Sequence, residues 1–195
     1  KKYKMFIDGK WVHSESRKTF QSLNPENNEP WAEVPEASEK DIDKAVNAAQ
    51  KAFEGTWSKL FPKERAIYLK AIAEQLRENA EHLGKIETID TGKLFKETKT
   101  QANYIAEYYD YYAGLADKVE GTVLPIDKAN MQVITTRVPI GVVAAIIPWN
   151  SQMLLTAVKL APALAMGNTI VIKSSELAPA TLFELGKLIE KTGIP

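Results

Sequence analysis

The last third of the chain alternates two short apolar runs with two helical patterns, and this alternation restricts the fold more than any other feature. The apolar runs cover residues 141–147 and 169–173. They predict buried strands, whereas residues 152–165 and 178–192 have helical spacing and end near a glycine. A strand, helix, strand and helix in this order form a parallel sheet with a right-handed crossover. We therefore predict an α/β fold with a Rossmann-like parallel sheet and flanking helices.

A polar turn follows each of the two predicted strands before the next helix begins. The first turn lies in Ile146-Ile147-Pro148-Trp149-Asn150 and the second in Lys173-Ser174-Ser175-Glu176. Ligands of open α/β sheets bind beyond the carboxyl ends of the strands, so these turns form the candidate site. The pattern G-x-G-x-x-G is missing, because bulky Pro148 and Trp149 occupy the first turn. A dinucleotide site therefore does not follow from a glycine motif.

The N-terminal half predicts a hairpin followed by helices. An Asp8-Gly9 pair stands between apolar residues, which is a strong hairpin signal. Ser38 and Asp41 form a capping-box pattern that starts a helix ending at Gly55. The apolar positions of this helix repeat at helical spacing and predict a buried face: Ile42, Ala45, Val46, Ala49, Ala52 and Phe53.

Two further helices are predicted before residue 120. Pro62 opens one that keeps its apolar period through Ile86, and the break at Thr91-Gly92-Lys93 separates it from another over residues 97–117. That last helix carries five tyrosines, at positions 104, 108, 109, 111 and 112. Such a stripe is compatible with stacking on single-stranded nucleic acid, but packing is favoured because no basic groove accompanies it.

The stretch 131–139 is rich in β-branched residues and predicts an edge strand. Pro139 removes a ladder hydrogen bond at its end. Exposed strand edges are commonly covered by another subunit, so we expect an oligomer contact here.

The composition excludes several classes of partner. The 25 basic and 25 acidic residues cancel, so no net charge attracts nucleic acid or an anionic membrane. No apolar stretch approaches the ~20 residues that span a bilayer, and no signal sequence is evident. A cytoplasmic location is the expectation. The chain has no cysteine, which excludes disulfides, thiolate metal ligands and a cysteine nucleophile within these residues.

Several motifs in the same order and spacing resemble the N-terminal portion of the NAD(P)-dependent aldehyde dehydrogenase superfamily. They lie in Asn24-Pro25, residues 87–93, residues 146–150, residues 159–168 and Lys173 to Pro179. The resemblance covers almost the whole chain. It implies oxidation of an aldehyde to a carboxylic acid by thiolate attack, hydride transfer to nicotinamide and hydrolysis of a thioester. It also implies a homo-oligomer, a dimer or tetramer, with NAD as cofactor.

Asn150 matches the family carboxamide that stabilises the oxyanion together with a backbone N–H. A preorganised neutral donor suits that task, and the loss of one such donor typically costs ~10²–10³ in rate. The alternative is that Asn150 only caps the helix after it.

The resemblance assigns a second group of residues to the cofactor. Lys173 and Glu176 match residues that hold the adenosine ribose, with Ser175 beside them. A carboxylate there repels a 2′-phosphate and favours NAD, while NADP stays an alternative if Glu176 swings away. An exposed local ion pair is the structural alternative. The cofactor cleft is lined by Ile146, Ile147, Pro148 and Trp149, a run that is otherwise typical of a buried strand.

Two more residues have family counterparts with weaker support from the sequence. Lys159 resembles a lysine with a charge-relay role, yet it lies about two and a half turns after Asn150 on an ideal helix, roughly on the opposite face. A lysine whose stem covers apolar surface is the alternative. Asp90 matches a monovalent-cation site of some relatives. The alternative is that it is a surface carboxylate near a helix end. The carboxylate without a cation is favoured, and we predict no metal site.

The family pattern should continue beyond Pro195 with a glycine-rich turn, a catalytic Glu and a catalytic Cys. We therefore expect the N-terminal segment of the enzyme, inactive alone, with three parts: residues 1–120, an oligomerisation arm at 121–140, and a βαβα unit at 141–195. A stand-alone binding or assembly module, and a segment of a CoA-acylating aldehyde dehydrogenase, are the alternatives. The aldehyde itself is not selected by these residues.

Overall fold

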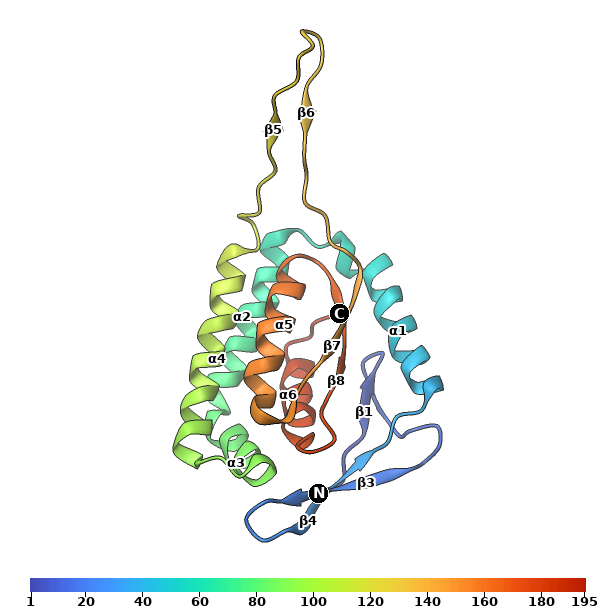
Figure 1. Cartoon of the computed structure of the whole chain (residues 1–195), viewed down its shortest axis with the longest axis vertical. Coiled ribbons are helices and arrows are strands. Elements are labelled where there is room, and N and C mark those ends of the chain that lie inside the picture. The colour runs from blue at the N-terminus through green and yellow to red at the C-terminus, as the bar shows by residue number, and fades with distance from the viewer.

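The computed structural model describes residues 1–195 and places a small parallel sheet between a layer of helices and a single helix (Figure 1). The sheet pairs β7 (Val142–Ile146) with β8 (Thr169–Lys173). One side is covered by a helical layer that includes α5 (Gln152–Ala165) and α4 (Phe95–Leu115), and α1 (Glu39–Glu54) lies on the other side. The predicted α/β class is confirmed.

The βαβα unit forms as predicted and ends with α6 (Ala180–Lys191). Its two strands run parallel, in register from Val142 opposite Thr169 to Ile146 opposite Lys173. Asn168 fixes the entry to β7, because its side-chain oxygen accepts hydrogen bonds from the backbone N–H groups of Ile140 (2.7 Å) and Gly141 (3.0 Å). A single amide thus joins the ends of two segments that are far apart in sequence.

The predicted long helix from Pro62 is wrong in one respect, because it is two helices. Asn79 ends α2 (Pro62–Glu78) with φ −110° and ψ 15° and starts α3 (Ala80–Thr91). Its side-chain amide donates to the carbonyl of Gln75 at 2.8 Å. The apolar period continues across the break, so periodicity did not reveal it. Gly92 then ends α3 in the left-handed conformation, at φ 77°.

The main core lies in the helical layer. A cluster of 21 buried residues joins α2, α3, α4, α5 and α6, with Leu69, Leu76 and Ile105 fully buried. Tyr109 is fully buried as well, whereas Tyr104 and Tyr111 are exposed. The tyrosine stripe therefore packs only in part, and the ring of Tyr112 packs against those of Tyr108 and Tyr111.

The helix α1 begins as predicted at a capping box. Asp41 accepts hydrogen bonds from the backbone N–H of Ser38 (2.9 Å) and from its hydroxyl (2.7 Å). The expectation of a buried apolar face is wrong for part of the helix, because Ile42 and Val46 are exposed. The two strands β7 and β8 are too narrow a surface to cover the whole face.

Two antiparallel hairpins form the N-terminus. The predicted one pairs β1 (Met5–Ile7) with β2 (Lys10–Val12), and Asp8 and Gly9 both have positive φ, as a type I′ turn requires. A second hairpin, which the sequence analysis did not predict, pairs β3 (Thr19–Asn24) with β4 (Glu29–Pro35). The short η1 (Trp57–Lys59) links α1 to α2.

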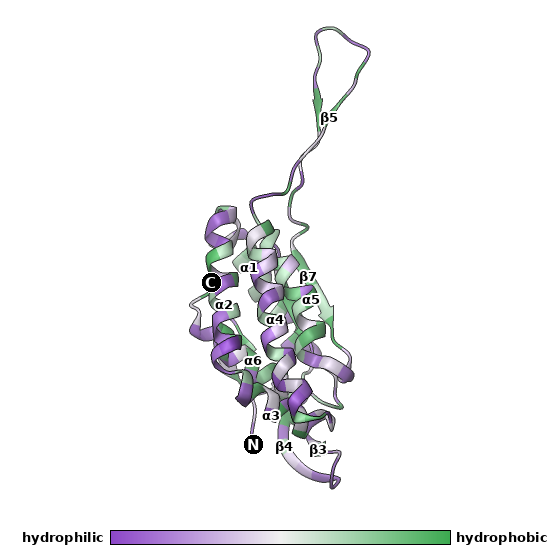
Figure 2. Ribbon diagram, turned by 90° about the vertical axis from the view of Figure 1, so that its left-hand side faces the viewer, coloured by the Kyte–Doolittle hydropathy of each residue, from purple (hydrophilic) through white to green (hydrophobic).

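A long arm projects from the body between α4 and β7, and Figure 2 shows it standing clear of the helices. Only β5 (Val123–Leu124) and β6 (Val133–Ile134) pair within it. The predicted strand over 131–139 is therefore much shorter than expected, because the arm has no larger sheet to join. Val123, Ile134 and Val138 are exposed. No helix of the protein is both long enough and apolar enough to span a membrane.

Candidate functional site at the carboxyl ends of β7 and β8

Strand register brings the two polar turns together. Ile146 lies opposite Lys173, and the backbone N–H of Ile147 donates to the carbonyl of Lys173 at 3.0 Å. Both chains leave the sheet at this point, so the turn through Asn150 and the turn through Glu176 start from neighbouring positions at one edge. The two polar turns therefore lie side by side, as expected from the ends of neighbouring parallel strands.

Asn150 lies in a short 3₁₀ turn, η2 (Trp149–Ser151), immediately before α5. The helix cap is Ser151, so the alternative that Asn150 itself caps α5 is wrong. Its carboxamide is exposed and makes no hydrogen bond within the chain. A turn that displays an amide without using it leaves both amide groups free to bind a ligand.

The residues before Asn150 divide into exposed and buried ones. Ile146 and Trp149 are 72% and 51% exposed, and Pro148 is exposed too. Ile147 is buried and supports the turn from beneath. The alternative of a wholly buried strand is therefore wrong for Ile146, which adds an apolar surface to this edge.

Lys173 and Glu176 form an ion pair of 2.9 Å in which both side chains are exposed. The hydrogen bond from Lys173 lowers the pKa of the Glu176 carboxyl and keeps it charged. Ser175 is buried, and its hydroxyl accepts a hydrogen bond from the backbone N–H of Leu177 at 3.2 Å. Ser175 thus shapes the turn, while the ammonium and the carboxylate point to solvent.

Lys159 is engaged within its own helix. Its ammonium donates to the carbonyl of Leu155, one turn earlier in α5, at 3.1 Å, and the residue is half-buried. This arrangement agrees with the helical geometry, which separates Lys159 from Asn150.

A partly buried ion pair lies next to the Asn150 turn. Lys93 donates to the hydroxyl of Ser151 and lies 3.5 Å from a carboxylate oxygen of Glu87. Glu87 is fully buried, and burial raises its pKa against the opposing effect of Lys93. Neither Glu87 nor Lys93 was predicted to lie beside the site. The available signal was Glu87, an acid among the buried apolar positions of its helix.

Asp90 is not a surface carboxylate, as the structural alternative supposed, because it is 1% exposed. It accepts hydrogen bonds from the hydroxyl of Ser22 (2.6 Å), the indole of Trp31 (3.2 Å) and the backbone N–H of Ala180 (2.7 Å). Burial raises its pKa, and these donors oppose the shift. Both of its carboxylate oxygens thus accept hydrogen bonds from other parts of the chain.

Comparison with known proteins identifies the family. The model of the aldehyde dehydrogenase family matches residues 11–195. This chain belongs to the aldehyde dehydrogenase family. It is 48% identical over 194 residues to (Z)-2-((N-methylformamido)methylene)-5-hydroxybutyrolactone dehydrogenase of Acinetobacter baylyi, a match that covers 99% of this chain and 39% of the relative.

Solved structures agree with the family assignment. An aldehyde dehydrogenase from Bacillus cereus, in mutant form, superposes with a TM-score of 0.97 at 38% identity and covers 100% of this chain and 40% of its own. A betaine aldehyde dehydrogenase mutant from Staphylococcus aureus, in complex with NAD+, gives 0.94 at 37% identity and covers 98% and 39%. The chain therefore spans about two fifths of the length of these aldehyde dehydrogenases.

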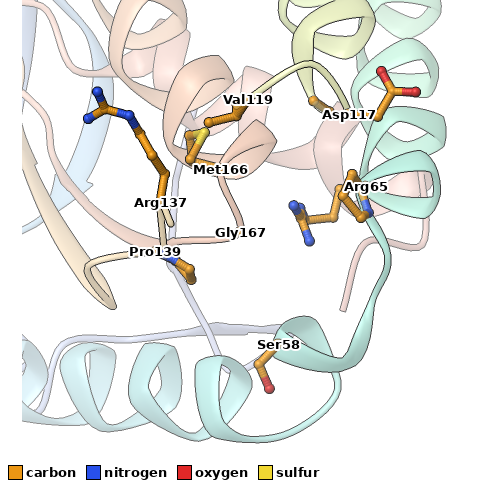
Figure 3. Close-up of a pocket in the computed structure, with 10 residues that line it drawn as sticks. Ser58, Arg65, Asp117, Val119, Arg137, Pro139, Met166 and Gly167 are labelled. Carbon is orange, nitrogen blue, oxygen red and sulfur yellow. The ribbon is translucent and has the colours of Figure 1, made fainter. Parts of the chain in front are cut away.

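The cavity drawn in Figure 3 lies elsewhere in this aldehyde dehydrogenase segment. It has a volume of about 270 Å³ and sits at the opposite end of the sheet, where Pro139 and Gly167 precede the two strands. Arg65 and Arg137 lie on opposite sides of it. Arg65 is already engaged, because it donates to the carbonyls of Ala165 (3.1 Å) and Leu60 (2.7 Å). We interpret this cavity as a gap at the base of the arm, apart from the candidate site.

Proposed function

We propose that this chain supplies the ribose-binding and oxyanion-binding part of an NAD-dependent aldehyde dehydrogenase that converts an aldehyde to a carboxylic acid. The observation that carries the proposal is the register of β7 and β8. It starts the amide-bearing turn and the carboxylate-bearing turn from neighbouring positions, Ile146 and Lys173, and both turns are exposed. The relatives are named as dehydrogenases, and one of them was solved with NAD+.

The residues at this edge fit the adenosine end of NAD. Glu176 is charged and exposed, and one of its two carboxylate oxygens makes no contact with Lys173, so it is free to accept from ribose hydroxyls. Lys173 is free to donate to one hydroxyl, and Ser175 keeps the turn in shape. The apolar lining comes from Ile146, Pro148 and Trp149, with Ile147 behind them. A charged carboxylate favours NAD over NADP by like-charge repulsion of a 2′-phosphate.

When bound, NAD supplies the hydride acceptor of the reaction. Asn150 is proposed to donate from its amide to the oxygen that becomes negative when a thiolate adds to the aldehyde carbonyl. A neutral donor held by a helix start needs little reorganisation at that moment. The thiolate itself lies outside these residues, since the chain has no cysteine.

A charge-relay role of Lys159, which the family resemblance implies, would require its ammonium to leave the carbonyl of Leu155. The chain is proposed to have three parts, at 1–120, 121–140 and 141–195. The middle part, the arm, is proposed to mediate homo-oligomer contacts through its exposed apolar residues. A cytoplasmic location belongs to the same proposal.

The test is a nucleotide titration of the purified chain, monitored by tryptophan fluorescence or calorimetry. We expect weak NAD binding, weaker NADP binding, and loss of the preference for NAD in Glu176→Gln. Glu107→Gln, an exposed acid on α4, is the matched control. A folded chain that ignores both nucleotides would contradict the proposal and favour the stand-alone assembly module.

A further inference from the structure

The starts of α5 and α6 both depend on residues outside their own helices. Neither Ser151 nor Pro179, the residues that cap them, makes a side-chain capping hydrogen bond. The first turn of α5 also carries a cost, because Gln152 is fully buried with both amide atoms unpaired. Helix starts without local caps need partners from elsewhere for their free N–H groups.

Acceptors for such N–H groups come from the carboxylates of α3, and the backbone N–H of Met153, near the start of α5, opposes the rise in the pKa of Glu87. Asp90 near the end of α3 accepts from the N–H of Ala180, the first residue of α6, at 2.7 Å. Lys93, three residues later, donates to the hydroxyl of Ser151, and its charge is balanced by Glu87 one turn before Asp90. The two buried acids therefore face the N-terminal ends of two different helices, where negative charge is favourable.

Each of these two helix starts lies a few residues at most after one of the two turns of the candidate site. Ser151 is the residue after Asn150, and Ala180 comes four residues after Glu176. We propose that Lys93, held by Glu87, and Asp90 are positioning residues that fix the Asn150 turn and the Glu176 turn relative to each other through α3. This inference rests on the proposed function for its purpose, although the tethers themselves are independent of it.

Both acids are buried, so their contacts with the helix starts have a defined geometry that exposed surface charges would lack. Glu87 and Asp90 are 0% and 1% exposed. Asp90 also accepts from Ser22 and Trp31 on the second hairpin, so the same carboxylate links three segments. A buried carboxylate with several donors, such as Asp90, is costly to displace and therefore restricts the geometry around it.

The test compares backbone hydrogen exchange in variants of the chain without nucleotide. In Asp90→Ala, exchange at the N–H of Ala180 should become about fivefold to tenfold faster, as for the loss of one helix cap, with little change around Asn150. Asp90→Asn keeps an acceptor oxygen and should restore most of the protection. Equal loosening of both turns would indicate a general stabilising role and overturn the proposal.

The Lys93 tether is tested with the double variant Lys93→Met, Glu87→Gln, which removes the tether without leaving an unpaired buried charge. We expect a shift of the side-chain amide resonance of Asn150 and faster exchange near Ser151, with the start of α6 unchanged. Lys93→Arg should restore the resonance. An unshifted Asn150 amide in the double variant would refute the role of Lys93.

A nucleotide titration of the same variants separates this inference from the proposed function. If the unaltered chain binds NAD, both tether losses should weaken binding severalfold. If the unaltered chain binds no NAD but the exchange pattern appears, the tethers stand and the proposed function fails. If NAD binds equally to all variants and the exchange is unchanged, the tethers fail and the proposed function stands.

Discussion

Leu69 and Leu76 in the helical layer are fully buried, whereas Ile146 and Trp149 at the sheet edge are mostly exposed. The first region is held by apolar contacts among five helices, and the second by strand register and by charged side chains at helix starts. The difference shows that stability and the candidate site have separate sources in this chain. Substitutions should therefore affect one without the other.

The largest effect is expected in the helical core. Leu76→Ala should lower the free energy of unfolding by about 2–5 kcal/mol, because it leaves a cavity among buried neighbours. Ile42→Ala on the exposed face of α1 is the control and should change it by less than ~0.5 kcal/mol. Urea unfolding measures both. Similar losses in the two variants would mean that the exposed face of α1 is covered in solution.

The next effect concerns the charge cluster around Glu184. Burial alone would raise the pKa of this carboxyl, but the hydrogen bonds from Tyr3 and His82 and the charges of Lys1 and Lys187 lower it from 4.5 to about 2. A lowered pKa gives stability that is present above the ordinary value and is lost as the pH falls toward 2. Glu184→Gln should remove this loss, which is on the order of 3 kcal/mol.

Acid titration of unfolding free energy measures this, with Glu107→Gln as the control. Glu87 and Asp90 act in the opposite direction, because their pKa values are raised by burial and their ionisation destabilises the fold as the pH rises. An acid limb that is identical in Glu184→Gln and in the unaltered chain would show that other carboxyls cause it.

A smaller effect is expected at the start of α1. Asp41→Ala should destabilise the chain by about 2 kcal/mol, because the N–H groups of Ser38 and Glu15 both lose their acceptor. Asp43→Ala, an exposed acid on the same helix, should be nearly neutral. Thermal unfolding compares the two, and an equal effect would contradict the capping-box interpretation.

The smallest effect on stability is expected at the candidate site itself. The ion pair of Lys173 with Glu176 is exposed, so Glu176→Gln should change the unfolding free energy by less than ~0.5 kcal/mol. Urea unfolding at low and high salt is the measurement. A large loss would show that the pair has a structural role and that the candidate site also contributes to stability.

Local patterns in the sequence were sufficient for most elements. The strands at 142–146 and 169–173, the hairpin at Asp8-Gly9 and the cap at Ser38 follow from composition, periodicity and turn chemistry. The break at Asn79 was missed because the apolar period does not change there. The second hairpin was missed because its strands are short and only partly alternate.

The sequence by itself determined the class of fold and the two turns at the ends of the parallel strands, because both depend on neighbours in the chain. Only the tertiary structure decided that Asn150 is free, that Asp90 is buried, and that Lys93 reaches Ser151. The physical reason is that burial and long-range hydrogen bonds depend on which helices meet, and a pattern of local spacing contains no information about the partner.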